Sequence, residues 1–262
     1  MNYIQYFFIT IITILFFTSC EKVIEVNVND AAKKYVIEAV LTNEAGGNQV
    51  KISQTKAINE DNRFVGVTGA QVQILDQNGV SVSLIETSQG IYRSTLIGDP
   101  GKSYTLQVRV GDETFTATSQ MPQAVALDSL FVSSMNMMGE KEYYANVVYT
   151  DPAEKGNAYR FVQYLNGVKN KDIFIQNDDL SNGRKNTNTL YTHGDEIKQG
   201  DQIRVEMLTI DPQVYKYWYS LRQGATGEGN AASPANPLSN INGGALGYFS
   251  AHTVSAKAVT VE

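Results

Sequence analysis

Two alternating segments, Ala70-Gln71-Val72-Gln73-Ile74-Leu75 and Val80-Ser81-Val82-Ser83-Leu84-Ile85, flank the four residues Asp76-Gln77-Asn78-Gly79. Apolar side chains recur at every second position of both segments, which is the period of a β-strand with one buried face and one solvated face. The Asn78-Gly79 pair favours the tight turn that joins two antiparallel strands. This part of the chain therefore predicts a β-hairpin, and it indicates the architecture of the residues around it.

The same alternation continues on both sides of the hairpin. Further strands are expected at 35–41, 49–53, 91–95, 104–110 and 114–118. Short strands separated by turns at such regular spacing are typical of an antiparallel sandwich. We therefore predict an immunoglobulin-like or transthyretin-like β-sandwich over residues 31–122.

Part of this predicted sandwich resembles a known module. The pattern Gly69-Ala70-x-Val72-x-Ile74-x-Asp76-x-x-Gly79 is similar to the start of transthyretin-like or carboxypeptidase-regulatory-type modules, and Tyr92, Gly101 and Tyr104-x-Leu106-x-Val108 are similar to their second half. Such modules are usually non-catalytic spacers or binding domains. The resemblance supports the predicted fold and implies no particular activity.

Residues 123–262 predict a second β-rich domain, either a β-sandwich or a partial barrel. Its expected strands are 125–132, 143–149, 159–167, 171–176, 202–209, 246–251 and about 258–261. One helix is expected at about 212–223, since Asp211-Pro212 provides a helix start and the residues Val214, Tyr217, Trp218 and Leu221 fall on one face. Trp218 is expected to fill the core of this domain, and residues 224–244 are expected to form a long loop. The fold class predicted for the chain is all-β.

The first residues have the pattern of a bacterial lipoprotein signal. An apolar run ends in Phe17-Thr18-Ser19-Cys20, and Cys20 is the only cysteine of the chain. In such signals the peptide is cut before the cysteine, and acyl chains on the new terminus anchor the protein stably. A transmembrane helix would need roughly 20 apolar residues, and an ordinary secretory signal would need an A-x-A-like cleavage site, which is absent. We predict a signal region at 1–20, lipid attachment at Cys20, and a tether at 21–30.

This prediction places the protein at the outer membrane, held by its lipid anchor. Whether it faces the periplasm or the cell surface stays open. The chain has 27 acidic and 21 basic residues and a net charge of −6, which argues against nucleic acid and against adhesion to anionic lipid through a basic patch. Without a second thiol, a disulfide, a cysteine-ligated zinc and a cysteine nucleophile are excluded after cleavage. We expect no cofactor and no enzymatic activity.

Two groups of acidic and amide residues are candidate sites. The oxygen atoms of Asn177, Asp178, Asp179 and Asn182 suit Ca²⁺, although their spacing departs from that of a calcium-binding loop and a solvated polar turn is the alternative. Asp195, Glu196 and Asp201 can supply paired carboxylates for acid–base chemistry. Gly194-Asp195 and Gly200-Asp201 are also ordinary hairpin turns.

Histidines and tyrosines provide the remaining candidates. His193 and His252 would form part of a metal or catalytic site only if the fold brought them together with further ligands. Four tyrosines on predicted strands are able to form a stacking platform for a glycan or a peptide; they are Tyr143, Tyr144, Tyr159 and Tyr164. The alternative is that strands contain tyrosine because of its β-propensity and packing.

Several stretches together resemble the Bacteroidota envelope lipoproteins of unknown function that are often encoded beside TonB-dependent outer-membrane receptors. The stretches are Cys20-Glu21-Lys22, Asp151-Pro152, Asn157-x-Tyr159-Arg160-Phe161, Gly200-Asp201, Tyr215-x-Tyr217-Trp218, and Ser239-Asn240-Ile241-x-Gly243-Gly244-x-Leu246-Gly247-Tyr248-Phe249. The resemblance implies a location and a neighbouring receptor. It carries no catalytic residues to this chain.

These observations lead to one expected function and two alternatives. We expect a lipid-anchored accessory of a TonB-dependent receptor that takes part in nutrient capture, with a small molecule, a glycan or a peptide as its ligand. The first alternative is a structural or adhesive surface lipoprotein. The second alternative is a hydrolase that uses an unfamiliar pair of carboxylates, but no paired motif in the sequence supports it.

Overall fold

In the computed structural model, the described residues are 32–56, 60–61, 63–137, 139–193, 196–225 and 236–262. Residues Lys33–Glu262 form one compact unit. Strands dominate the described residues, and these contain a single helix, so the all-β fold class is confirmed. The predicted signal region 1–20, with Cys20, and the tether 21–30 lie outside the described residues.

The first sandwich is a sheet folded over on itself. Its strands are β1 (Tyr35–Thr42), β2 (Gln49–Gln54), β3 (Gln71–Asp76), β4 (Ser81–Ser88), β5 (Ile91–Arg93), β6 (Ser103–Val110), β7 (Glu113–Gln120) and the first half of β15 (Leu246–Thr260). The hydrogen-bonded order is β15-β1-β2-β5-β4-β3-β6-β7. A bridge between Thr116 and Asn242 brings β7 back to the residues that precede β15. The alternating buried side chains of these strands, such as Ile37, Ile74 and Leu106, form one core.

The predicted hairpin between β3 and β4 is confirmed. Asp76 Oδ1 accepts hydrogen bonds from the backbone N–H groups of Asn78, at 2.8 Å, and of Val80, at 2.9 Å. These two bonds lower the pKa of the Asp76 carboxyl group, the one from Val80 most. Gly79 has a φ of +82°, which a residue without a Cβ adopts at little cost.

The second sandwich packs two sheets face to face. One is the three-stranded sheet of β8 (Leu127–Met137), β9 (Glu140–Thr150) and β13 (Lys185–Leu190). The other contains β10 (Ala158–Leu165), β11 (Val168–Lys169), β12 (Phe174–Asn177), β14 (Gln202–Ile210) and the second half of β15. Tyr149, Phe161 and Val205 are among the buried residues between them. Strand β13 was not predicted from the sequence, because its residues are mostly polar and partly exposed.

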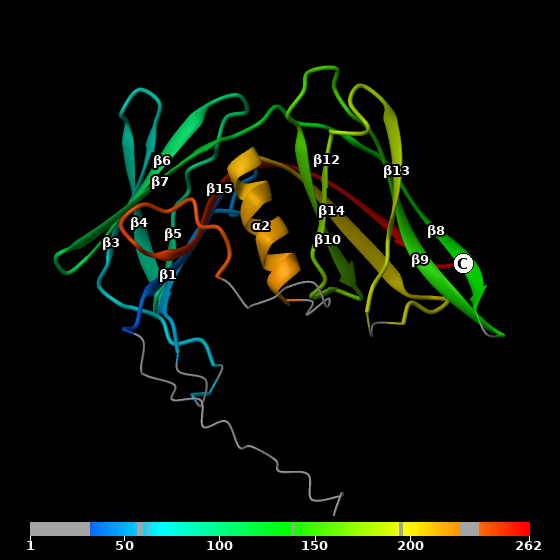
Figure 1. The fold of residues 1–262 in the computed structure, drawn as a ribbon, viewed down its shortest axis with the longest axis horizontal. Coiled ribbons are helices and arrows are strands. Elements are labelled where there is room, and N and C mark those ends of the chain that lie inside the picture. Colours follow the sequence, from blue (N-terminus) through cyan, green and yellow to red (C-terminus); the bar gives the residue numbers. More distant parts are fainter. Residues whose placement is uncertain (1–31, 57–59, 62, 138, 194–195, 226–235) are drawn as a thin grey trace, which may run out of the picture. The chain divides into compact units, whose positions relative to one another are not determined.

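The prediction of two short strands at 246–251 and 258–261 is wrong, because both belong to one strand, β15. It is continuous, pairing parallel with β1 from Leu246 to His252 and antiparallel with β14 from Thr253 to Thr260. Figure 1 shows it in red, crossing from the β1–β7 strands to the β8–β14 strands. Small and hydroxyl side chains interrupt its apolar alternation, but its backbone is paired throughout. Although they lie beyond residue 122, Phe249 and Ala251 belong to the core of the first sandwich.

The motif before β15 fixes the strand in place. The Asn240 side chain accepts a hydrogen bond from Phe249 N, at 2.9 Å, and donates one to Phe249 O, at 2.8 Å, so an amide group replaces a neighbouring strand. Gly247 has a φ of +104°, and a Cβ on it would lie 2.0 Å from the Ile37 carbonyl oxygen of β1. The close approach of β15 to β1 therefore requires glycine at this position.

Helix α2 (Pro212–Ala225) lies on the outer face of the second sandwich, against β10, β12 and β15. Its buried residues Val214, Tyr217 and Trp218 pack on Val162, Leu208 and Tyr248 in a third cluster. The predicted apolar face of the helix is therefore confirmed. None of the helices in the described parts of the chain has the length and apolarity to span a membrane.

Replacing Gly247 by alanine is expected to destabilise the protein by about 3 kcal/mol or more, because a strained φ is combined with a clash against β1. The matched control is Gly244→Ala, where φ is +88° and nothing lies within 4 Å of the new Cβ; strain alone predicts about 1–2 kcal/mol there. Urea unfolding followed by circular dichroism measures both. Equal losses in the two variants would contradict the close packing of β15 on β1.

Candidate functional site

Helix α2 positions two aromatic side chains of the candidate site. Asp211 caps the helix, since its Oδ1 accepts a hydrogen bond from Gln213 N at 2.7 Å. Its other oxygen accepts a hydrogen bond from Gln120 N of β7, at 2.9 Å. The helix start is thereby tied to both sandwiches, which fixes the directions of Tyr217 and Trp218.

Arg160 of β10 lies on the ring of Trp218. The guanidinium carbon is 3.4 Å from the centre of the indole ring, the distance of a close cation–π contact. In the sheet, Arg160 is paired with Leu208 of β14 and with Ile175 of β12, both of them buried apolar residues. A charged residue thus emerges between buried apolar neighbours.

The guanidinium group of Arg160 lacks an acceptor for its Nε. This atom is buried and has no hydrogen-bond partner among the described residues. The six ion pairs found in the same part of the chain also leave Arg160 out. Burial lowers the pKa of Arg160, yet an arginine stays protonated at any physiological pH. A buried donor without an acceptor normally costs about 1–3 kcal/mol.

Tyrosines complete an aromatic wall beside Arg160. The Tyr248 ring of β15 lies 4.8 Å from the Tyr217 ring and 5.1 Å from the Trp218 ring, measured between centroids. Burial raises the pKa of Tyr248 to about 12 and also raises that of Tyr217. Among the described residues, neither hydroxyl group has a hydrogen-bond partner. Both phenols stay protonated and remain able to donate.

Charged residues of both sandwiches face this wall. Glu38 of β1 acts electrostatically on Arg160, and Lys51 of β2 acts on Lys169 of β11. Lys169 is exposed overall, but desolvation of its ammonium group, followed by the like charge of Arg160, lowers its pKa. Glu206 of β14 is already engaged by Arg204 and by the Tyr164 hydroxyl group.

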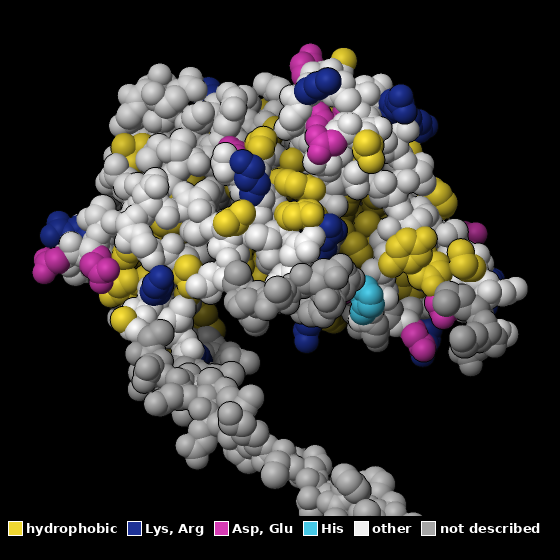
Figure 2. Space-filling model, viewed as in Figure 1, with side chains coloured by type: hydrophobic (Ala, Val, Ile, Leu, Met, Phe, Trp, Pro, Cys, Tyr) yellow, Lys and Arg dark blue, Asp and Glu magenta, His cyan; other side chains and the backbone are white. Residues whose placement is uncertain are grey.

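We call this set of residues the Arg160 cluster; its members are Glu38, Lys51, Arg160, Lys169, Tyr217, Trp218 and Tyr248. It combines a buried hydrogen-bond donor that lacks an acceptor with aromatic walls, and it contains no serine, threonine or cysteine. Figure 2 shows one face of the molecule, with hydrophobic side chains near the centre, where Figure 1 shows helix α2, and with basic side chains beside them. The arrangement is suited to binding a ligand.

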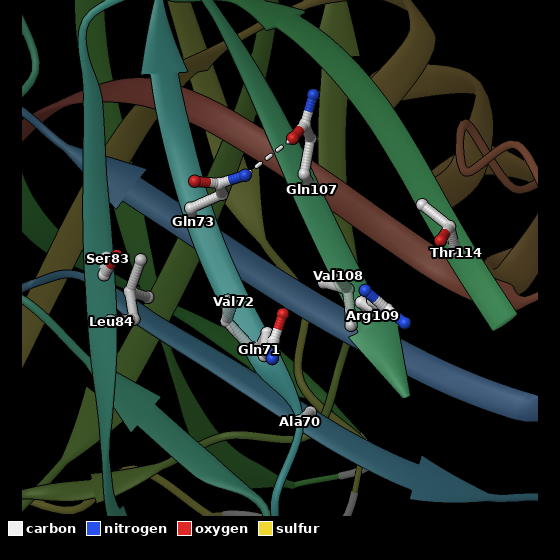
Figure 3. Close-up of a pocket in the computed structure, with 10 residues that line it drawn as sticks. All are labelled: Ala70, Gln71, Val72, Gln73, Ser83, Leu84, Gln107, Val108, Arg109 and Thr114. Atoms are coloured by element: carbon white, nitrogen blue, oxygen red, sulfur yellow. Dashed lines mark hydrogen bonds between the residues drawn. The ribbon is translucent and has the colours of Figure 1, made fainter. Parts of the chain in front are cut away.

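Two hollows lie elsewhere on the surface. One of about 540 Å³ lies over β3, β4, β6 and β7 and is lined mainly by amide, hydroxyl and apolar side chains, with Arg109 as its one charge (Figure 3). Across it Gln73 donates a hydrogen bond to Gln107 at 2.7 Å, so these amides satisfy each other. The other hollow, of about 300 Å³, is lined by Asp172, His193 and Arg222 among others. Gln73 and Gln107 of the first hollow are thus paired with each other, in contrast to the Nε of Arg160.

The candidate calcium residues form a structural turn. Asp178 is buried, and its Oδ2 accepts hydrogen bonds from the backbone N–H groups of Gly156, at 2.6 Å, and Asn157, at 3.0 Å. Asn182 donates to the Ala153 carbonyl oxygen at 3.0 Å, and Asn177 to Asp179. The carboxylate and amide groups are used to hold two loops together. Within the described ranges, no group of three or more His, Cys, Asp or Glu side chains is placed to hold a metal ion.

The candidate carboxylates are engaged at a turn. Asp201 accepts hydrogen bonds from Asn166 Nδ2 at 2.9 Å and from Lys198 N at 2.7 Å, and these bonds lower its pKa. Glu196 is exposed and lies 3.4 Å from the Lys198 ammonium group. Asp195 lies outside the described residues. Asp201 therefore has a turn-forming role, in line with the hairpin alternative.

The two histidines occupy different environments. His193 is exposed and lies 3.3 Å from Asp172. His252 is buried in β15, where its Nδ1 lies 2.8 Å from the Ser250 hydroxyl oxygen. Burial, followed by the charge of Arg160, lowers the pKa of His252 to about 3. No described contact joins the two residues.

The four candidate tyrosines do not form one platform. Tyr159 is buried in the second core, where it packs 4.8 Å from Tyr149 and donates a hydrogen bond to Asp151. Tyr164 bonds to Glu206, whereas Tyr144 packs on Tyr191 at 5.1 Å. Tyr143 is half-buried against the second core. Packing accounts for Tyr159 and Tyr143, and Tyr164 lies next to the Arg160 cluster.

Arg160 was not predicted from the sequence as a binding residue. Its side chain shares a strand face with Ala158 and Val162, both buried. A lone arginine at such an alternating apolar position was the available signal, because a charged residue rarely occupies a buried strand face without a partner. Its neighbours from β1, β2 and α2 have no local signal in the sequence.

Comparisons with known proteins identify a family and distant structural similarity. A family model described as a domain of unknown function, DUF4249, matches residues 21–258. A segment of two fibronectin type III domains from chicken tenascin is 13% identical over 68% of this chain and 90% of that chain, with a TM-score of 0.23. A DUF4785 family protein from Legionella pneumophila is 14% identical over 68% of this chain and 52% of that chain, with a TM-score of 0.25. No curated protein matches the chain.

Buried, neutral His252 makes stability depend on pH. Its pKa of about 3 in the folded protein lies below the unfolded value of about 6.5, so its contribution is complete above pH 6.5 and is lost as the pH falls toward 3. Between pH 7 and pH 5 this group alone is expected to remove about 2 kcal/mol. Urea midpoints at the two pH values measure the loss.

The matched variants are His252→Gln, which removes the titrating group, and His193→Gln, which removes the exposed histidine. The pH dependence should shrink in the first variant and stay unchanged in the second. An unchanged dependence in His252→Gln would contradict the burial of a neutral imidazole.

Proposed function

The chain belongs to the DUF4249 family of unknown function, and from that premise we propose that it is a non-enzymatic, lipid-anchored outer-membrane protein that captures a ligand for a TonB-dependent receptor. The lipid anchor would be attached at Cys20. The ligand would bind at the Arg160 cluster. The resemblance to Bacteroidota envelope lipoproteins supports the receptor as a partner.

A single observation carries the capture function. The hydroxyl groups of Tyr217 and Tyr248 form no hydrogen bond with described residues but are not fully buried, whereas the Nε of Arg160 beside them is a buried donor without an acceptor there. Folding alone does not favour this, because buried polar groups are almost always hydrogen-bonded. A ligand that supplies the acceptors would stabilise the site, and this is what supports capture.

The supporting chemistry is that of binding. Within the cluster, the residues able to act as bases are Glu38 and two lysines, and none of them has a hydrogen bond to a hydroxyl or thiol nucleophile in the described structure. Catalysis by general acid–base groups requires such contacts. We therefore include the absence of enzymatic activity in the proposal.

One observation favours the second candidate function, that of a structural or adhesive lipoprotein. Strand β15 connects the two sandwiches without a linker, as a stiff spacer would require. Exposed apolar side chains on β8, such as Phe131 and Met135, offer contact area. This candidate leaves the unsatisfied donors of the Arg160 cluster without a role.

A pull-down of the full-length lipoprotein from solubilised outer membrane tests the proposal. We expect the natural chain to recover a TonB-dependent receptor in a stoichiometric amount. Cys20→Ala should leave the membrane fraction and recover little receptor, because the anchor concentrates the protein at the membrane. Arg160→Lys should still recover the receptor, since capture and docking are separate contacts. An outer-membrane protein recovered without any receptor would contradict the proposal and favour the structural or adhesive candidate.

A further inference from the structure

We infer that the Arg160 cluster binds the carboxylate group of a singly charged organic ligand with an apolar body. This inference rests on the proposed capture function and adds the chemical class of the ligand. It depends on the hydrogen-bonding geometry, the walls and the charge of the cluster.

The geometry of Arg160 selects a planar oxyanion. One face of the guanidinium group is covered by Trp218 at 3.4 Å, so a ligand approaches the edge of the group. That edge presents parallel N–H donors in a fixed fork, which matches the two oxygens of a carboxylate. Stacking on the indole ring also holds the fork in one orientation, so that little conformational entropy is lost on binding.

Neutral donors surround the fork. The hydroxyl groups of Tyr217 and Tyr248 come from α2 and β15, and their rings lie 4.8 Å apart. Neither hydroxyl has a partner in the described parts of the chain, and both phenols stay protonated because burial raises their pKa. A carboxylate accepts up to four hydrogen bonds. It is able to satisfy the Arg160 edge and a phenol at the same time.

The walls favour an apolar ligand body. Trp218, Tyr217 and Tyr248 contact one another edge-to-face or tilted, and each keeps 7–8% of its surface exposed. Aromatic side chains supply large contact area to an apolar group. A small inorganic anion would leave this surface uncovered.

The charges limit the ligand to one negative charge. Arg160, Lys51 and Lys169 are opposed by Glu38, which acts electrostatically on Arg160, Lys169 and both buried phenols. Glu206 adds a second carboxylate near Lys169. The balance is weakly positive within a chain of net charge −6. A phosphate dianion would be repelled by Glu38, whereas a single carboxylate is neutralised by Arg160.

Fluorescence of Trp218 provides the test, because it is the only tryptophan of the chain. The full chain in detergent is titrated with phenylacetate and with phenylacetamide, its uncharged analogue. We expect a saturable change with phenylacetate at up to about 10 mM, the range of weak fragment binding, and none with phenylacetamide. Inorganic phosphate at the same concentration should not displace phenylacetate.

Matched variants identify the residues responsible. Arg160→Lys keeps the charge and loses the fork, so the dissociation constant for phenylacetate should rise about tenfold or more. Tyr217→Phe removes one hydroxyl group and should raise it about fivefold. The controls are Arg109→Lys, outside the cluster, and Tyr219→Phe, an exposed residue of the same helix. Both controls should bind as the natural chain does.

Three results would overturn the inference: no saturable change with phenylacetate, equal binding of phenylacetamide, or displacement by phosphate at equal concentration. An affinity that Arg160→Lys and Tyr217→Phe leave unchanged would overturn it as well. The receptor pull-down has a separate readout. Loss of phenylacetate binding with the receptor retained would reject only the ligand class, whereas carboxylate binding without a receptor would reject only the proposed partner.

Discussion

Backbone pairing of β15 with β1 on one side and with β14 on the other is the interaction on which the rest of the molecule depends. It places Phe249 and Ala251 in the first core and brings Tyr248 next to helix α2. The hydrogen bond from Val254 N to Asn43 Oδ1 adds a further tie between the two regions. Since one strand belongs to both sandwiches, residues of β1, β2, β10 and β11 are held at fixed positions around Arg160.

The elements that could be predicted from the sequence are those determined by residues within the element itself. The β3–β4 hairpin follows from alternation and an Asn-Gly turn, and helix α2 follows from its capping residue and its apolar face. Strand β13 was missed, because the run Lys185-Asn186-Thr187-Asn188-Thr189 carries no apolar period. Its partner β9 supplies the backbone hydrogen bonds that hold it. For β15, the length is determined by β1 and β14, which are distant in the sequence.

Candidate sites were predicted where polar residues lie close together along the chain. In the structure, these residues form turns. Asp178 and Asp201 accept backbone hydrogen bonds, which is the common role of acidic residues in loops. The Arg160 cluster draws one residue from each of five strands and two from helix α2, so most of its members are far apart in the sequence. Trp218 was expected only to fill a core. It does pack in the third cluster, and it also supports the guanidinium group.

The long separation between β1 and β15 has a consequence for the order of folding. The hydrogen bond between Asn43 and Val254 joins residues 211 positions apart, so the first sandwich lacks a strand of its sheet until nearly the whole described chain has been synthesised. Non-local pairing of this kind slows folding. In the meantime the edge of β1 is unpaired and prone to join strands of other molecules. Until β15 arrives, this edge is therefore expected to be vulnerable to aggregation, and the first half of the protein is not expected to fold as an independent unit during synthesis.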